Sequence, residues 1–230
     1  MLRIYDCLVV DHNLVLVGVA AAICALGVVA TMMATGRSIA AERNLAWAAL
    51  AGVCATTAIW STHFVAMLAY LEQVDVSYDV VRTVASFLAG GIPITIGFVA
   101  AIRNRTLKRI SFAAGALVGS GIVALHYIGM AAAQFAGRHL EYDTDLVVAS
   151  IVFSVGFSVA ALHYGAVRSS RWSLYLGAGL LLLTTVSLHF TAMGAAVVVF
   201  DPFMPYMESG ISRGSLAIIV TLATLAMDFV

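Results

Sequence analysis

The chain of 230 residues contains 62% hydrophobic and 10% charged residues, and its formal net charge is zero. An average soluble domain carries about 25% charged residues, and a soluble fold must present enough polar atoms to water. The composition therefore excludes a soluble globular domain and indicates an integral membrane protein. A net charge of zero gives no indication of an acidic or basic partner.

Seven apolar runs are long enough to cross a bilayer, which takes roughly 20 apolar residues per helix. They occupy residues 14–34, 45–68, 83–102, 111–134, 146–167, 174–197 and 214–230. We therefore predict an all-α, polytopic membrane bundle of seven transmembrane helices that forms one domain over residues 1–230. Because the last run ends almost where the sequence ends, we expect this domain to be part of a longer protein with a cytoplasmic domain.

The segments that connect these helices alternate in charge. Eight of the twelve basic residues lie in one set of segments: Arg37, Arg43, Arg103, Arg105, Lys108, Arg109, Arg168 and Arg171. The other set is acidic and contains Glu72, Asp75, Asp79, Glu141, Asp143, Asp145, Asp201 and Glu208. Short cytoplasmic loops are enriched in Lys and Arg. We therefore expect the N-terminus outside and the C-terminus inside.

One motif recurs three times: a histidine, an aromatic residue, two further residues and a methionine. The copies are His63-Phe64-Val65-Ala66-Met67, His126-Tyr127-Ile128-Gly129-Met130 and His189-Phe190-Thr191-Ala192-Met193. Successive histidines are 63 residues apart, which indicates an internal repeat of helix pairs. Each motif lies late in an even-numbered helix that runs from inside to outside, so we expect all three at one depth near the outer face.

The residue types in this motif are those of a metal site. His and Met four residues apart lie on one face of a helix, in layers ~6 Å apart. Imidazole suits copper, zinc, iron and nickel, whereas thioether favours copper, and the lack of carboxylates argues against magnesium, calcium or manganese. We therefore predict a copper site formed by His63, Met67, His126, Met130, His189 and Met193. Whether it holds one ion or two stays open, and so does the alternative that the copies are relics of duplication maintained by helix packing.

These motifs resemble a known family. Trp60-Ser61-Thr62-His63-Phe64 and Leu125-His126-Tyr127-Ile128-Gly129-Met130-Ala131-Ala132 are similar to segments of the MHYT domain, a bacterial seven-helix membrane sensor module, and the resemblance covers nearly the whole chain. The methionine that precedes each histidine in that family is replaced here by Thr62, Leu125 and Leu188, so these positions cannot supply a thioether.

The resemblance carries functional implications. It implies a location in the bacterial inner membrane and a copper site that senses copper or a diatomic gas such as oxygen, nitric oxide or carbon monoxide. It also implies a cytoplasmic output domain in the same chain, commonly one that makes or degrades cyclic diguanylate.

Three further histidines lie outside the repeated motif. His12 precedes the first helix at the depth of the motifs, so it is an additional candidate ligand. His163 has no methionine four residues later and lies near the inner end of its helix, so we interpret it as a packing residue. His139 lies in an outer loop, where we expect it to be solvated. The three scattered cysteines, at positions 7, 24 and 54, are too few for a disulfide framework.

Signatures of catalysis are missing from these residues. The sequence contains no nucleotide-binding glycine loop, catalytic triad or zinc-protease helix, and nothing suggests nucleic-acid binding. The main alternative to a sensor is a membrane transporter or channel for metal ions or small solutes, and a third is a scaffold without metal. Polar groups cluster at the outer end instead of continuing across the membrane, which favours the sensor. The expected surroundings are the lipid bilayer, and the oligomeric state stays open, a homodimer included.

Overall fold

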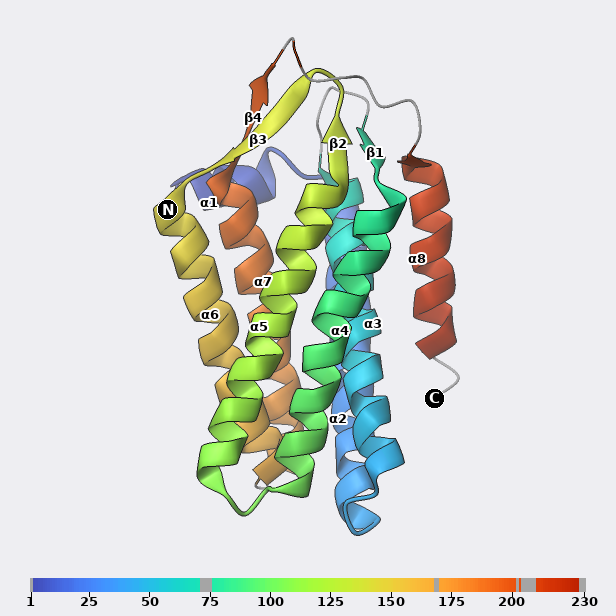
Figure 1. Cartoon of the computed structure of the whole chain (residues 1–230), viewed down its shortest axis with the longest axis vertical. Coiled ribbons are helices and arrows are strands. Elements are labelled where there is room, and N and C mark those ends of the chain that lie inside the picture. Colours follow the sequence, from blue (N-terminus) through green and yellow to red (C-terminus); the bar gives the residue numbers. More distant parts are fainter. Residues whose placement is uncertain (1, 71–75, 168–169, 202, 204–209, 228–230) are drawn as a thin grey trace.

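The long helices stand side by side in a bundle, with small β-sheets at one end (Figure 1). The computed structural model describes residues 2–70, 76–167, 170–201, 203 and 210–227. Within these residues, six helices are long and apolar enough to cross a membrane. They are α2 (Leu14–Ala40), α3 (Leu45–Ala69), α4 (Val80–Arg103), α5 (Lys108–Ala132), α6 (Thr144–Leu162) and α7 (Arg171–Ala195). The chain leaves α6 through a π-helical turn, η1 (His163–Val167).

Shorter elements complete the structure. Helix α1 (Leu2–Val9) precedes the first long helix, and α8 (Arg213–Met227) follows the last one. The strands are β1 (Val76–Tyr78), β2 (Ala133–Phe135), β3 (Arg138–Tyr142), β4 (Ala196–Phe200) and β5 (Ile211–Ser212). They form an antiparallel sheet in the order β2-β1-β5 and an antiparallel pair, β3 with β4. Both sheets cover the end of the bundle at which α3, α5 and α7 finish (Figure 1).

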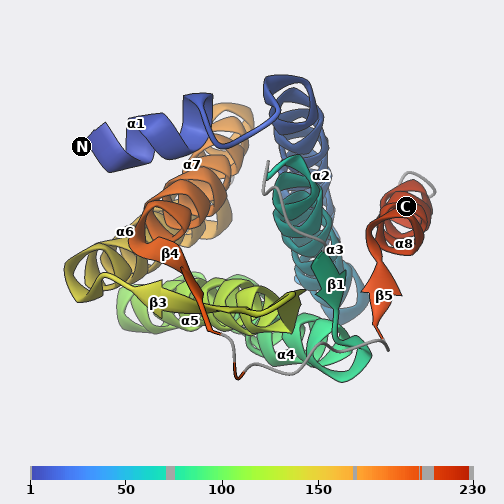
Figure 2. The ribbon, with the colours of Figure 1, turned by 90° about the horizontal axis from the view of Figure 1, so that it is seen from above.

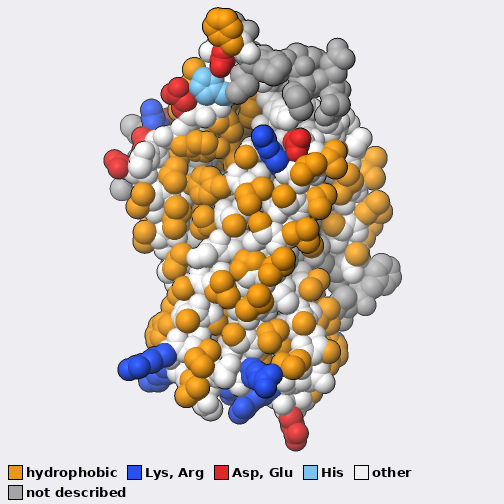
Figure 3. Space-filling model, in the orientation of Figure 1, with side chains coloured by type: hydrophobic (Ala, Val, Ile, Leu, Met, Phe, Trp, Pro, Cys, Tyr) orange, Lys and Arg blue, Asp and Glu red, His pale blue; other side chains and the backbone are white. Residues whose placement is uncertain are grey.

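The surface of the bundle is the one expected of a membrane protein. Side chains such as Val15, Val81 and Ile92 are 76%, 75% and 59% exposed on the long helices. A lipid environment accounts for this exposure, since large apolar surface patches are rare on soluble monomers. Figure 3 shows apolar side chains over the length of the bundle and basic side chains at the end opposite the sheets.

The structure confirms an all-α polytopic bundle and differs from the predicted elements at two places. Helix α8 has 15 residues, which corresponds to ~22 Å at 1.5 Å per residue, so it is shorter than the six long helices. Because residues 228–230 of the predicted run 214–230 lie outside the described residues, a seventh spanning helix stays a prediction. Helix α1 and the strands were not predicted from hydropathy.

The three helices that carry the repeated motif have matching limits. Helices α3, α5 and α7 contain 25 residues each and begin at positions 45, 108 and 171. Each is joined to the helix before it at the same point: the capping residue of the earlier helix donates its backbone N–H to the last carbonyl of the later one. The donor and acceptor pairs are Asn13 with Ala69, Asp79 with Ala132 and Asp143 with Ala195, at 2.8, 2.9 and 2.9 Å. These bonds fix each motif helix against its preceding helix at an equivalent point, and the three helix pairs surround a common centre (Figure 2).

Glycines on α5 allow α6 to pack closely against it. A Cβ added at Gly119 would lie 2.7 Å from the Cα of Val155, and one added at Gly115 would lie 2.5 Å from the Cα of Val159. The Ser154 hydroxyl donates a hydrogen bond to the Gly119 carbonyl at 3.0 Å. Close backbone approach at small residues is a common way to pack helices in membranes.

This contact predicts that Gly119→Ala lowers the free energy of unfolding by about 1–3 kcal/mol, because the added methyl group overpacks the interface. Gly156→Ala is the matched control, since a Cβ at Gly156 meets nothing within 4 Å. Denaturant unfolding of the purified protein in detergent measures both changes. Equal stability of the two variants would contradict the close α5–α6 contact.

Candidate metal centre

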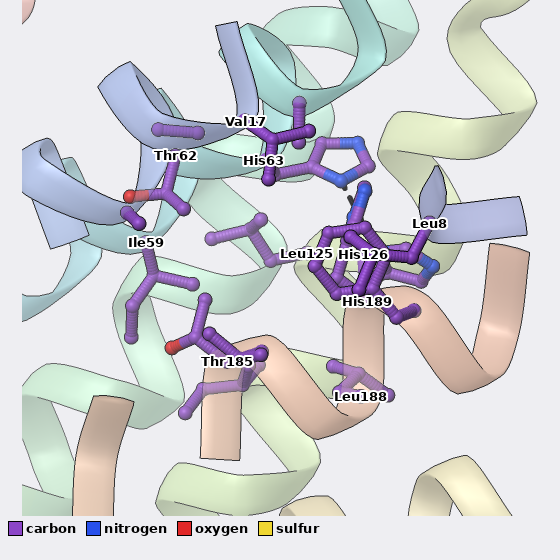
Figure 4. A pocket seen from close by; sticks show the side chains of 16 residues that line it. Leu8, Val17, Ile59, Thr62, His63, Leu125, His126, Thr185, Leu188 and His189 are labelled. Carbon is purple, nitrogen blue, oxygen red and sulfur yellow. Dashed lines mark hydrogen bonds between the residues drawn. The ribbon is translucent and has the colours of Figure 1, made fainter. Parts of the chain in front are cut away.

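Three histidines from three helices meet inside the half of the bundle that is nearer the β-sheets. His63, His126 and His189 each lie six residues before the last residue of α3, α5 and α7. Their ring centroids are 4.8 Å (His63 to His126), 5.6 Å (His63 to His189) and 5.3 Å (His126 to His189) apart. One nitrogen from each ring lies within 4.8 Å of those from the other two. Figure 4 shows the rings converging from separate helices.

The three imidazoles are buried and largely without hydrogen-bond partners. Their relative exposures are 3%, 2% and 5%. The Nδ1 atoms of His63 and His126 are 3.1 Å apart, so one of them donates and the other accepts. Within the described residues, both Nε2 atoms of this pair and both ring nitrogens of His189 have no partner. Unpaired buried nitrogens are costly, and lone pairs of neutral imidazoles are the donors that copper and zinc bind. The residues present therefore fit a metal ion.

Gly129 brings the second motif helix close to the first histidine. A Cβ at Gly129 would collide with the His63 imidazole at its Nε2 atom. Any side chain at position 129 would therefore move this ring or push α5 away from α3. The structure therefore gives this glycine a specific role in positioning His63.

The methionines of the motifs occupy equivalent buried positions one turn nearer the outer end. Met67, Met130 and Met193 are 3%, 1% and 4% exposed. The carbonyl of each accepts a hydrogen bond from the residue that caps the end of its helix. Side chains on a helix lean toward its N-terminus, so the thioethers lean toward the imidazole layer. Their role as ligands stays a prediction.

His12 lies against the three-histidine cluster, as its position in the sequence suggested. Its ring centroid is 6.3 Å from that of His189 and 5.6 Å from that of Phe190. The Nδ1–H of His12 donates to the carbonyl of Cys7 at 2.6 Å, which leaves the lone pair on its buried Nε2 atom, and that atom has no partner among the described residues. Burial lowers the pKa of His12, while the Cys7 carbonyl and the charge of Asp11 partly oppose this effect. His12 is therefore a neutral imidazole at pH 7 and can act as a further donor.

The two remaining histidines lie away from the cluster. His163 is in η1, and its ring stacks on Phe112 at 5.2 Å with an interplanar angle of 11°. This contact fits the packing role inferred for it. His139 lies on β3, with its two nitrogens 3.4 Å from Glu141 and 3.5 Å from Asp201.

The sequence analysis did not identify the contacts that surround the end of α3. Arg213, at the start of α8, donates from its Nη2 atom to the carbonyls of Leu68 and Tyr70, at 2.9 and 3.2 Å. His12 forms an isolated β-bridge with Tyr70. The sequence does mark Arg213 as unusual, since it is one of four basic residues outside the basic loop segments. Its partners are backbone carbonyls, which no sequence pattern reveals.

Cys7 provides a test of whether α1 closes the outer side of this centre. It is 4% exposed, and burial, with a smaller effect of the Asp11 charge, raises the pKa of its thiol from 9.0 to about 12. Only the thiolate is nucleophilic, so at pH 8 iodoacetamide should modify Cys7 about 100-fold or more slowly than in the denatured protein. Site-resolved mass spectrometry measures these rates. Similar rates in the folded and denatured protein would mean that α1 does not cover the centre.

Comparisons with known proteins place these features in a family. The MHYT family, described as "Bacterial signalling protein N terminal repeat", matches residues 57–114 and 119–178. An uncharacterized signaling protein of Caulobacter vibrioides is 33% identical over 95% of this chain and 27% of its own length. Two proteins of Pseudomonas aeruginosa are each 31% identical: the bifunctional diguanylate cyclase/cyclic di-GMP phosphodiesterase MucR, over 96% of this chain and 33% of its own, and the cyclic di-GMP phosphodiesterase NbdA, over 71% and 21%.

The chain thus spans a third or less of the length of these relatives. No solved structure matches it. The family match covers the first two histidine motifs and the helices between them, so it confirms the resemblance that those motifs indicated. The chain belongs to the MHYT family of bacterial signalling proteins.

Proposed function

We propose that this chain is the sensor region of a membrane signalling protein and that it binds copper at His63, His126 and His189. The convergence of three buried imidazoles whose nitrogens lack partners carries this proposal. Met67, Met130 and Met193 supply softer donors one turn further out, and His12 supplies a fourth imidazole. Bound copper would provide an open coordination position for a small ligand, such as a diatomic gas.

The chemistry of the donors favours copper over other ions. Among the described residues, the cluster of candidate ligands consists of histidines alone, and the buried side chains next in the motif are thioethers. Hard ions such as magnesium and calcium require oxygen donors, whereas a mixture of imidazole and thioether suits copper. The protein contributes a preformed arrangement, because the three rings are buried and already lie close together.

The likeness to cyclic di-GMP enzymes suggests the output. MucR and NbdA are much longer than this chain, so we propose that a cytoplasmic domain of the cyclase or phosphodiesterase type follows these residues in the full protein. Helix α3 connects the metal site to the C-terminal part of the chain. It carries His63, and Arg213 of α8 binds the carbonyls of Leu68 and Tyr70 at its end. A shift of α3 that follows ligand binding would move α8, the described element nearest the C-terminus.

A transporter would need polar groups along a path through the membrane. The buried polar side chains of the described helices are hydroxyls and the imidazoles discussed above. Several of these hydroxyls donate to a carbonyl of their own helix, as Thr31, Thr56 and Thr184 do, and the buried side chains of the described helices include no carboxylate or ammonium group that would continue a path for ions. We therefore favour a sensor.

Copper binding should depend on the three histidines. We expect purified protein to bind copper, each of His63→Ala, His126→Ala and His189→Ala to weaken binding at least about tenfold, and the triple variant to bind none at that site. His163→Ala is the matched control, because its ring lies in η1 away from the cluster. Elemental analysis after equilibration with copper measures occupancy. A triple variant that retains as much copper as the parent would refute the site.

Gly129→Ala should weaken copper binding without removing a ligand. The added methyl group displaces the His63 ring, and losses of about 10–100-fold are typical when a group that orients a ligand is changed. Gly179→Ala serves as the control, since a Cβ there meets nothing within 4 Å. Copper titration compares the affinities of the two variants. The proposed position of His63 is wrong if both bind like the parent.

The proposed topology places the N-terminus outside and the C-terminus inside the bacterial inner membrane. It rests on the basic residues at the end of the bundle opposite the β-sheets (Figure 3) and on the enrichment of Lys and Arg in cytoplasmic loops. Reporter fusions after Lys108 and after Asp143 should therefore show opposite locations, with the first cytoplasmic. The same location for both would contradict this topology.

A further inference from the structure

A cavity adjoins the three histidines. It has a volume of about 250 Å³ and is lined by residues of α1, α2, α3, α5 and α7. The residue immediately before each histidine and a residue one turn before each histidine form part of its wall: Thr62, Leu125, Leu188, Ile59, Ile122 and Thr185. The cavity therefore extends at least one turn inward of the imidazole layer. Ala66 of α3 and Leu8 of α1 also line it, so it reaches past this layer, and the rings of His63, His126 and His189 form part of its wall (Figure 4).

The wall of this cavity is almost wholly apolar. Apart from the imidazoles, the lining contains two hydroxyl side chains, those of Thr62 and Thr185. Thr185 donates to the carbonyl of Leu181 in its own helix, so this hydroxyl is already used. A buried water needs two to four polar partners, whereas apolar cavities of about 150 Å³ stay dry and bind xenon or benzene. The lining thus selects uncharged, apolar molecules.

The cavity opens sideways, between α2 and α7. Ala21 is exposed on the surface of α2, and Val17 of α2 and Val186 and Phe190 of α7 are partly exposed. These surfaces belong to helices that cross the membrane, so the opening faces hydrocarbon.

The outer aqueous side is closed by comparison. Above the imidazoles lie the buried side chains of the motif methionines, and His12 is 2% exposed beside them. Among the described residues that line the cavity, the exposed or partly exposed ones are Val17 and Ala21 of α2, Val186 and Phe190 of α7, and Leu8 of α1. Four of these five residues lie on α2 and α7, so the opening between these two helices is the main route to the imidazoles.

We infer that this cavity binds a small apolar molecule that is dissolved in the bilayer, enters between α2 and α7, and reaches the inner face of the three-histidine cluster. This inference rests on the proposed function, in which the three-histidine cluster is the sensor site. It adds the chemical class of the ligand and the route by which the ligand reaches that site. Outside the imidazoles the lining is apolar, so it disfavours hydrated ions and strongly hydrogen-bonding solutes along the route from the opening. A molecule of a few heavy atoms fits the volume and still leaves the imidazoles accessible.

Xenon is the probe for this cavity, because it is apolar and needs no metal. Xenon NMR of the metal-free protein in lipid nanodiscs should detect a bound population in the parent. Ala21→Phe, at the opening, should reduce that population at least about fivefold, as expected when a bulky ring fills an apolar cavity. Ala22→Phe is the matched control: Ala22 is the adjacent exposed residue of α2 and is not part of the lining.

A second pair of variants approaches the opening from α7, in case Ala21→Phe does not fold. The variants are Val186→Trp and its control, Leu183→Trp. Val186 lines the cavity, whereas Leu183 lies on the same helix, is 46% exposed and is not part of the lining. Loss of bound xenon in Val186→Trp, but not in Leu183→Trp, supports the lateral route. Absence of bound xenon in the parent, or equal binding in each variant and its control, overturns the inference.

Two further results separate the alternatives. A lipid that native mass spectrometry finds retained by the parent and lost from Ala21→Phe would overturn the assignment to small molecules, because an acyl chain would then be the occupant. Copper content is measured on separate samples. Xenon binding without copper binding would support the cavity and refute the proposed metal site. Copper binding without xenon binding would support the metal site and refute the cavity.

Discussion

The structure depends on the burial of three imidazoles inside the bundle of long helices. A polar group in hydrocarbon without a hydrogen-bond partner costs free energy, and His63, His126 and His189 hold four such ring nitrogens among the described residues. Packing must maintain this arrangement against that cost. Backbone hydrogen bonds from each capping residue fix the end of the next helix at an equivalent point in each pair, and Gly129 leaves room for the His63 ring.

The same arrangement gives the two sides of the imidazole layer different properties. On the outer side, buried thioethers, His12 and α1 cover the rings, and Arg213 ties the end of α3 to α8. On the inner side, the rings face an apolar cavity that opens between α2 and α7. The centre thus combines soft metal donors and a link to the C-terminal helix on one side with a lipid-facing space on the other.

Sequence patterns predicted the parts of this design that follow from periodicity. The interval of 63 residues placed the histidines at equal depth, and long apolar runs revealed the six long helices. Hydropathy failed where an apolar segment is not a spanning helix. Residues 196 and 197 belong to the predicted sixth apolar run, but they begin strand β4. Helix α1, with eight residues, is too short to produce an apolar run of spanning length. The collision that only glycine avoids at position 129, the carbonyl partners of Arg213 and the cavity depend on how helices are placed against one another. A single sequence does not contain that information.

The central claim is that these three histidines bind copper together. Pulsed electron paramagnetic resonance of the protein loaded with cupric ions measures it most directly, because couplings to imidazole nitrogens identify and count the histidine ligands. Selective nitrogen-isotope labelling of histidine distinguishes these couplings from those of backbone nitrogens. The account predicts couplings from His63, His126 and His189, with one set lost in each single alanine variant. A copper signal without histidine couplings, or one unchanged in all three variants, would contradict it.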